Sequence, residues 1–86
     1  MPNVEMYTSP LCPYSLRARS LLNARGIEFR EIHVHKDKHA KAQMRELSGR
    51  TSVPQIFIGD HHVGGSDELV AADASGELAR LLKCAA

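Results

Sequence analysis

The chain has 86 residues, of which 43% are hydrophobic and 24% are charged, and its formal net charge is +1. This length predicts one domain over residues 1–86, and the hydrophobic content excludes an intrinsically disordered chain. The small net charge and the scattered basic residues argue against a nucleic-acid partner, and no apolar run is long enough to cross a membrane.

Cysteine usage and the first residues of the chain indicate a reducing compartment. Cys12 and Cys84 lie near opposite ends, which is not the pattern of a disulfide framework. Residues 1–5 have neither the charged region nor the apolar region of a secretory signal peptide. We therefore expect a cytoplasmic protein, with Cys84 as a peripheral thiol in a tail beyond the last helix.

The first predicted elements are a strand over residues 4–8 and a helix, joined by a turn at residues 9–11. Pro13 suits the first helical position, because its fixed φ and missing N–H cost nothing there. Gly26 suits the end of this helix. Its predicted apolar face consists of Tyr14, Ala18, Leu21 and Leu22.

A second strand is predicted from Ile27 to Val34, although its alternation is imperfect. The apolar residues at 27 and 29 share one parity, and those at 32 and 34 share the other. A strand of a parallel sheet that is buried on both faces tolerates this pattern. A polar helix then runs from Lys36 to Ser48 and stops at Gly49. Its predicted apolar face consists of Ala40, Met44 and Leu47.

The last third of the chain predicts a hairpin followed by two helices. In order, we expect a loop (50–54), a strand (55–58), a turn (59–60), a return strand (61–63) and a break (64–65). Ser66 is predicted to cap a helix that continues to Ala72, and Ser75 to cap a last helix. The inward residues of the last helix are predicted to be Leu78, Leu81 and Leu82.

This order of elements places the chain in the α/β class. A βαβ unit comes first and requires a right-handed parallel crossover, and a helix follows it. An antiparallel hairpin and further helices complete the chain as a ββα unit. We therefore predict a four-stranded mixed sheet that is flanked by helices.

Cys12 is the candidate reactive residue. If Pro13 is the first helical residue, Cys12 is the N-cap, and the free N–H groups of Tyr14 and Ser15 point at its sulfur. These N–H groups, the helix dipole and the Ser15 hydroxyl all favour the thiolate over the thiol. The alternative is a buried cysteine that acts as a small hydrophobic residue. The position after a turn and before a proline makes that alternative the weaker one.

Three segments of the sequence resemble the glutaredoxin family, which has a thioredoxin-like fold. They are Val4–Thr8 with Cys12–Tyr14, then Gly49–Ile58, and then Gly64–Leu69. Their order and spacing cover nearly the whole chain and are most similar to the short bacterial glutaredoxins. The resemblance implies a cis peptide bond before Pro54, which the sequence alone does not establish.

The same resemblance implies glutathione as co-substrate, without a resident metal. The catalytic residues it implies are Cys12, Tyr14 and Ser15. The glutathione-binding residues it implies are Tyr14, Arg50, Ser52, Val53, Pro54, Gly65, Ser66 and Asp67. The residue types agree with this, because the Val53 backbone can pair with an extended peptide. The N–H groups that begin a helix at Ser66 suit a carboxylate, Asp67 suits an amine, and Arg50 suits a second carboxylate.

Taken alone, these residues also have ordinary interpretations: Ser66 and Asp67 as a helix cap, Val53–Pro54 as the start of an edge strand, and Arg50 as a solvated charge.

The sequence departs from the family most clearly at Ser15, where dithiol glutaredoxins have a second cysteine. Cys12 therefore retains only the monothiol route, in which glutathione from solution supplies the second thiol. The sequence leaves open whether Ser15 is the natural residue or an engineered replacement of cysteine. Ser9 stands where many relatives have a lysine, and Ser66 stands where relatives often have a third cysteine.

The function implied is that of a glutathione-dependent thiol–disulfide oxidoreductase that acts on glutathionylated proteins or small mixed disulfides. We expect it to act as a monomer, without nucleic-acid or membrane partners. Two other functions stay open, which are a glutathione-ligated [2Fe–2S] carrier and a catalytically silent binding module. His33 and His35 have a spacing that could bind a metal, but no acidic or cysteine ligand is spaced to complete a site.

Overall fold

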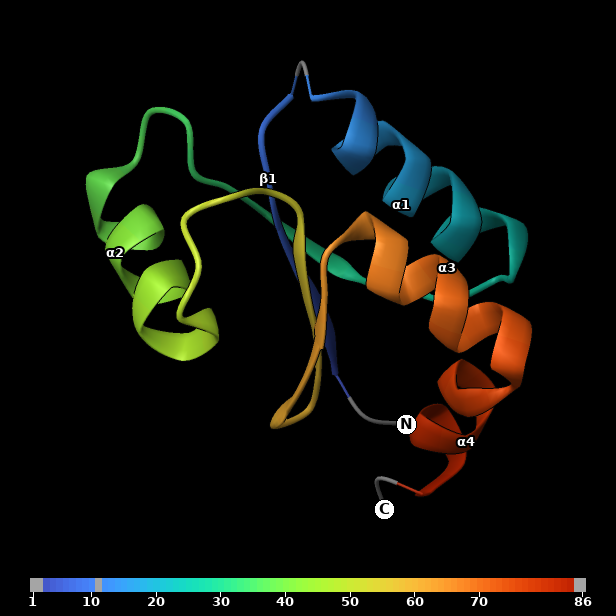
Figure 1. Cartoon of the computed structure of the whole chain (residues 1–86). Helices are drawn as coiled ribbons and strands as arrows, with labels where there is room; N and C mark the ends of the chain where they lie inside the picture. Colours follow the sequence, from blue (N-terminus) through green and yellow to red (C-terminus); the bar gives the residue numbers. More distant parts are fainter. Residues whose placement is uncertain (1–2, 11, 85–86) are drawn as a thin grey trace.

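A four-stranded mixed sheet in the order β2-β1-β3-β4 forms the centre of the computed structural model, which describes residues 3–10 and 12–84 (Figure 1). The strands are β1 (Val4–Thr8), β2 (Arg30–His33), β3 (Gln55–Ile58) and β4 (His61–Gly64). β1 is parallel to β2 and antiparallel to β3, and β3 forms an antiparallel hairpin with β4. The predicted α/β architecture is confirmed.

Helices cover both faces of this sheet (Figure 1). On one face lie α1 (Pro13–Ala24), α3 (Ser66–Ser75) and α4 (Glu77–Cys84), and α2 (Lys38–Ser48) lies on the other. None of the helices in the described part of the chain is long and apolar enough to cross a membrane.

The core consists of two clusters, one on each face of the sheet. Under α1, α3 and α4 lie Val4, Met6, Ala18, Leu22, Ile56, Ile58, Leu69, Ala72 and Leu78. Under α2 lie Tyr7, Val34, Ala40, Met44 and Phe57. Because successive side chains of a strand point to opposite faces, β1 and β3 contribute to both clusters. The two central strands are therefore buried on both sides.

The second strand is shorter than its predicted range of 27–34. Pairing with β1 runs only from Glu5–Arg30 to Thr8–His33. Ile27 and Phe29 precede the ladder and pack against the α1-side cluster. The change of parity that the sequence showed arises because the later apolar residues of this segment, Ile32 and Val34, belong to the α2-side cluster.

Two predicted helix faces were partly wrong. Tyr14 is 59% exposed, and the buried residues of α1 are Ser15, Ala18 and Leu22, which follow one another at helical spacing. In α2, Ala40 and Met44 are buried as expected, but Leu47 is 55% exposed.

Capping explains the shifted helix starts. α2 begins two residues later than predicted, because Asp37 is its N-cap and accepts a hydrogen bond from Ala40 N at 3.0 Å. Gly49 then ends the helix in the left-handed conformation (φ 72°), as expected. The N-cap of α3 is Gly65, so Ser66 is its first helical residue and not its cap.

The last two helices join at a glycine that the prediction overlooked. Ser75 is the last residue of α3, and Gly76 follows it in the left-handed conformation (φ 83°). The Ser75 hydroxyl still serves the start of α4, because it accepts a hydrogen bond from Glu77 N at 3.3 Å. α4 continues to Cys84, so this cysteine is not in a tail beyond the last helix, and its side chain lies outside the described residues.

Candidate active site

The sheet topology brings the three predicted site segments to one end of the molecule, at the top of Figure 1. β1 ends there and leads to α1. Because β3 is antiparallel to β1, it starts at the same end, where Gln55 pairs with Tyr7. β4 ends beside the start of β3, where Gly64 pairs with Ile56, and leads directly into α3. The segments 12–15, 50–54 and 65–67 therefore meet although they are far apart in sequence.

Cys12 is the N-cap of α1, as predicted. Its backbone is extended (φ −84°, ψ 121°), Pro13 is the first helical residue, and Leu16 N donates to the Cys12 carbonyl at 3.1 Å. The sulfur is partly buried and lies 3.8 Å from the carbonyl oxygen of Val53, toward which the thiol donates. This contact joins the start of α1 to the loop before β3.

The surroundings of Cys12 favour the thiolate. Burial acts to raise the pKa of the thiol, but hydrogen bonds from the Ser15 N–H, the Ser15 hydroxyl and the Tyr14 N–H outweigh burial, so the pKa is lowered. The Ser15 hydroxyl is fully buried and has no other hydrogen-bond partner among the described residues. A thiolate at Cys12 supplies the acceptor that this hydroxyl otherwise lacks.

The loop before β3 presents its backbone next to Cys12. The peptide bond between Val53 and Pro54 is cis, and Pro54 is buried. A Cβ atom at Gly65 would lie 3.3 Å from the Pro54 carbonyl oxygen, so the loop and the start of α3 approach closely at a residue without a side chain. Ser52 is exposed, and its carbonyl accepts a hydrogen bond from the Gln55 side chain.

The start of α3 combines free helix donors with a buried hydroxyl. The first N–H groups of a helix have no partner within the helix, and here they belong to Ser66 and its neighbours. The Ser66 side chain is 4% exposed, and its hydroxyl has no hydrogen-bond partner among residues 3–10 and 12–84. Asp67 is exposed, and Arg17 Nη1 lies 3.5 Å from its carboxylate. This arrangement can accept an anionic group at the helix end.

Arg50 is tied to α3 by an acid that sequence reasoning missed. Its Nη1 lies 2.6 Å from Glu68 Oε1, which also accepts a hydrogen bond from Gly65 N at 2.9 Å. The Gly65 N–H and then the Arg50 guanidinium lower the pKa of the Glu68 carboxyl. The signal in the sequence was a glutamate three residues after the N-cap, a spacing typical of a reciprocal cap.

The predicted residues are thus brought together to different degrees. Cys12, Val53 and Gly65 lie on segments in direct contact, the Ser15 hydroxyl donates to the Cys12 sulfur, and Arg50 contacts α3 through Glu68. The Tyr14 ring is exposed on the first turn of α1. Two residues that were not predicted also contribute. Gln55 holds the loop before β3 through Ser52, and Arg17 bridges α1 to α3 through Asp67.

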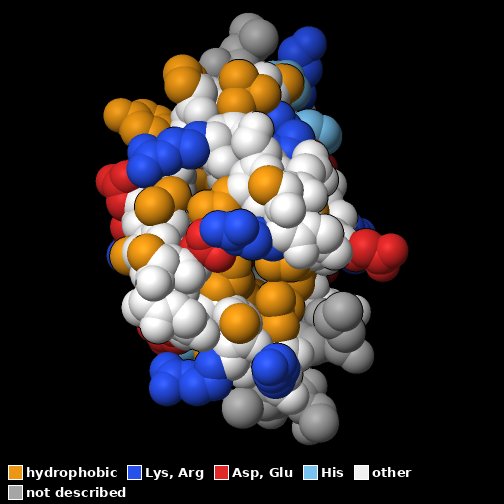
Figure 2. Space-filling view, turned by 90° about the vertical axis from the view of Figure 1, so that its right-hand side faces the viewer, with side chains coloured by type: hydrophobic (Ala, Val, Ile, Leu, Met, Phe, Trp, Pro, Cys, Tyr) orange, Lys and Arg blue, Asp and Glu red, His pale blue; other side chains and the backbone are white. Residues whose placement is uncertain are grey.

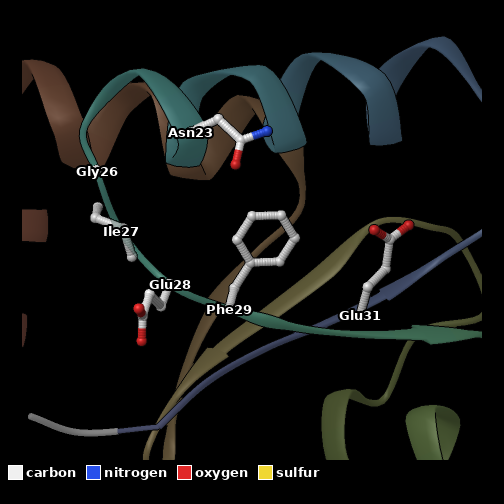
Figure 3. A pocket seen from close by; sticks show the side chains of 6 residues that line it. All are labelled: Asn23, Gly26, Ile27, Glu28, Phe29 and Glu31. Carbon is white, nitrogen blue, oxygen red and sulfur yellow. The ribbon is translucent and has the colours of Figure 1, made fainter.

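Two surface hollows lie away from this site. One is lined by Asn23, Gly26, Ile27, Glu28, Phe29 and Glu31, and Figure 3 shows the Phe29 ring standing between its segment and α1. The other extends from the same segment to β1 and α4, on the face where Figure 2 shows apolar side chains between charged ones. Neither is lined by a predicted site residue. The described residues also hold no cluster of three metal-binding side chains.

Comparison with known proteins identifies the relatives of this chain. The sequence model of the family described as Glutaredoxin matches residues 4–63. Glutaredoxin 3 of Escherichia coli K12 is 48% identical over 83 residues, which cover 96% of this chain and 100% of the relative. A glutaredoxin of Pseudomonas aeruginosa is 44% identical over 82 residues, covering 95% and 98% of the two chains. The solution structure of a Brucella melitensis glutaredoxin superposes with a TM-score of 0.85 at 49% identity, covering 96% and 90%. The predicted thioredoxin-like fold is confirmed.

Proposed function

The chain belongs to the glutaredoxin family, and from this premise we propose that it is a glutathione-dependent thiol–disulfide oxidoreductase that works through Cys12 alone. Glutaredoxins are generally oxidoreductases that use glutathione as co-substrate. The observation that carries the proposal is the position of Cys12, a cysteine with lowered pKa at a helix start and 3.8 Å from the Val53 carbonyl. A thiolate there is both a nucleophile and a good leaving group.

The proposed reaction has two exchange steps. The Cys12 thiolate attacks the glutathione sulfur of a mixed disulfide, so a disulfide to Cys12 forms while the bond to the target breaks. The target leaves as a thiolate and takes a proton from solvent. The thiolate of a second glutathione then attacks the glutathione sulfur on Cys12. Glutathione disulfide leaves, and the Cys12 thiolate is regenerated. In total, one free glutathione thiol is oxidised as one target thiol is released, and both glutathione units leave together as glutathione disulfide.

Glutathione would lie across the three segments described above. Its extended backbone would pair with the N–H and C=O of Val53, supported by Ser52 and Pro54. The start of α3, with Gly65 and Ser66, would bind the γ-glutamyl carboxylate.

The remaining groups would bind the ends of the tripeptide and its side. Asp67 would bind the amine, and Arg50 would share its guanidinium between the glycyl carboxylate and Glu68. Tyr14 would line the groove beside the sulfur.

Ser15 limits the proposed chemistry to the monothiol route. A serine hydroxyl cannot form a disulfide, so Cys12 has no partner thiol within its motif. The resolving thiol is therefore the second glutathione. We further propose that the protein acts on glutathionylated proteins or small mixed disulfides as a cytoplasmic monomer.

The test is glutathione-dependent release of a glutathionylated peptide, with Cys12→Ser compared against Cys84→Ser. The wild type and Cys84→Ser should turn over, and Cys12→Ser should not. Intact mass after incubation with glutathione disulfide should show one adduct, which peptide mapping assigns to Cys12. Turnover by Cys12→Ser, or an adduct only on Cys84, would overturn the proposal.

A further inference from the structure

We propose that Gln55 and His62 are positioning residues that hold the backbone of Ser52 and Val53 in the orientation that binds glutathione. This inference rests on the proposed function and assigns a role to two side chains that do not reach the sulfur. It follows from a chain of hydrogen bonds that runs from β4 through β3 to the loop.

Gln55 is the link between the sheet and the loop. Its side chain is almost fully buried, with 1% of the residue exposed. The amide nitrogen donates to the Ser52 carbonyl at 3.0 Å and lies 3.3 Å from the Ser52 hydroxyl. The carbonyl it holds belongs to the peptide unit that also carries the Val53 N–H. Fixing this carbonyl therefore fixes the direction of the N–H that the proposal assigns to glutathione.

His62 fixes the orientation of the Gln55 amide. Because the amide nitrogen faces Ser52, the amide oxygen faces His62, and His62 Nε2 lies 2.7 Å from it. The amide oxygen can only accept, so Nε2 carries a hydrogen and donates it. Without His62 the Gln55 oxygen would be buried and unpaired, which favours reorientation of the amide.

The His62 ring is itself held by packing. It stacks on Phe57, its cross-strand partner, with ring centroids 4.8 Å apart and an interplanar angle of 26°. Phe57 in turn meets Tyr7 edge to face at 5.8 Å. The positioning chain therefore ends in the α2-side core, which is rigid compared with a surface loop.

The charges around His62 are compatible with a neutral ring. Burial lowers its pKa, with further lowering from Arg50 and His61, and the Glu68 carboxylate acts in the opposite direction. The neutral ring with its hydrogen on Nε2 makes the observed bond. The role assigned to His62 is that of a fixed donor.

The test compares His62→Phe with His61→Phe. The phenyl ring keeps the stacking on Phe57 but removes the donor, whereas His61 is exposed on the same strand and serves as the matched control. We expect His62→Phe to raise the KM for a glutathionylated peptide, whose glutathione unit pairs with Val53, roughly tenfold, with kcat changed far less. A tenfold rise corresponds to the free energy of about one buried hydrogen bond. Gln55→Leu should raise KM by a similar factor. Because both residues act through the same hydrogen-bond chain, the double variant should have a KM no higher than that of either single variant.

Two further readouts separate positioning from loss of structure. The rate of Cys12 alkylation by iodoacetamide and its pH midpoint should change much less than KM, because the three donors that favour the thiolate belong to the start of α1, which the substitution leaves in place. Hydrogen–deuterium exchange of the peptide that covers residues 50–55 should become faster, and that of a β1 peptide should not. His62→Gln, whose amide can still donate, should retain most of the affinity for the glutathionylated peptide.

The outcomes are separable from those of the proposed function. An unchanged KM together with unchanged exchange at residues 50–55 in His62→Phe would overturn the inference. A KM that rises equally in His61→Phe would overturn it as well. If the wild type lacks glutathione-dependent turnover, the proposed function fails, and the exchange measurement alone decides whether His62 and Gln55 hold the loop.

Discussion

The sulfur of Cys12 lies between a carbonyl that accepts from its thiol form and three donors that favour its thiolate form. Val53 supplies the carbonyl, and the donors are the Tyr14 N–H and the N–H and hydroxyl of Ser15. Ionisation therefore exchanges one weak hydrogen bond for several stronger ones. Ser15, which prevents an internal disulfide, at the same time contributes to the reactivity of the remaining cysteine.

Ser15→Ala should raise the pKa of Cys12, because the substitution removes a donor to the thiolate and leaves both N–H groups in place. The pH dependence of alkylation by iodoacetamide measures this as an upward shift of the midpoint. Ser20→Ala, an exposed serine on the same helix, should leave the midpoint unchanged. A midpoint for Ser15→Ala equal to that of the wild type would show that the hydroxyl plays no part.

For single residues, the position along a helix could be predicted from the sequence better than the partner of a side chain. The N-cap position of Cys12 followed from Pro13, because a proline fits few other places in a helix. The pairing of Arg50 with Glu68 could not be predicted, since the two residues meet only after β4 has folded back on β3. Gln55 was overlooked because a polar residue at a strand start gives no sign of burial.

Single elements begin and end where capping groups allow. Asp37 sets the start of α2 by accepting from Ala40 N, and left-handed Gly49 sets its end. The stop was predicted correctly, and the start was placed two residues too early because Lys36 fits the polar composition of the helix. The strand β2 is also shorter than predicted. Ile27 and Phe29, which precede Arg30, pack against the core without forming strand pairs with β1.

Asp37→Ala should lower the free energy of unfolding by about 1 kcal/mol, because it removes the cap of α2. Urea denaturation followed by circular dichroism measures this as a lower midpoint. Asp37→Asn keeps an oxygen acceptor and should lose much less. Equal losses for the two variants would contradict a capping role.

A polar cluster joins α1, β1 and β2. Glu31 accepts hydrogen bonds from Thr8 Oγ1 at 2.8 Å and from two nitrogens of Arg19, and His33 Nδ1 lies 3.9 Å from it. The hydrogen bond from Arg19 is the main cause of the lowered pKa of the Glu31 carboxyl, opposed by burial and assisted by Thr8. The side chain is only 20% exposed, so solvent screens these interactions weakly.

Glu31→Gln should make stability less dependent on pH in acid. The folded protein has the lower pKa, so ionised Glu31 stabilises the fold above the pKa of an unfolded glutamate. This contribution is lost as the pH falls through the folded value. At neutral pH we expect a loss of roughly 1–3 kcal/mol, and at strongly acidic pH almost none. Urea denaturation at several pH values measures both, and Glu28→Gln, an exposed acid nearby, is the control.

The two core clusters share strands, and we therefore expect the molecule to unfold as one unit. β1 contributes Val4 and Met6 to one cluster and Tyr7 to the other, and β3 is divided in the same way. Loss of packing on one face therefore weakens the strands that support the other face. The parallel pairing of β1 with β2 and the antiparallel hairpin of β3 with β4 were predicted correctly, because a helical crossover and a tight turn each fix one direction. The order β2-β1-β3-β4, in which β1 lies beside β3, was not predicted.

Leu22→Ala and Met44→Ala each truncate a fully buried side chain, on opposite faces of the sheet. Each should lower the free energy of unfolding by about 2–5 kcal/mol. Both should shift the same single transition, with coincident curves from near-UV and far-UV circular dichroism. Leu16→Ala, which removes a side chain that is 51% exposed, should change stability by about 0.5 kcal/mol or less. Separate transitions for the two core variants would show that the clusters unfold independently.

Gly64 ends β4 with a φ of 120°, a conformation that side chains rarely adopt, and a Cβ atom there would lie 2.6–2.9 Å from three atoms of Glu68. Any larger residue would displace this glutamate, which would then release both the Gly65 N–H and Arg50. A change that adds no charge would in this way alter the electrostatic field across the rim of the candidate site. A glycine at the end of β4 therefore sets how Glu68 and Arg50 are arranged beside the candidate site.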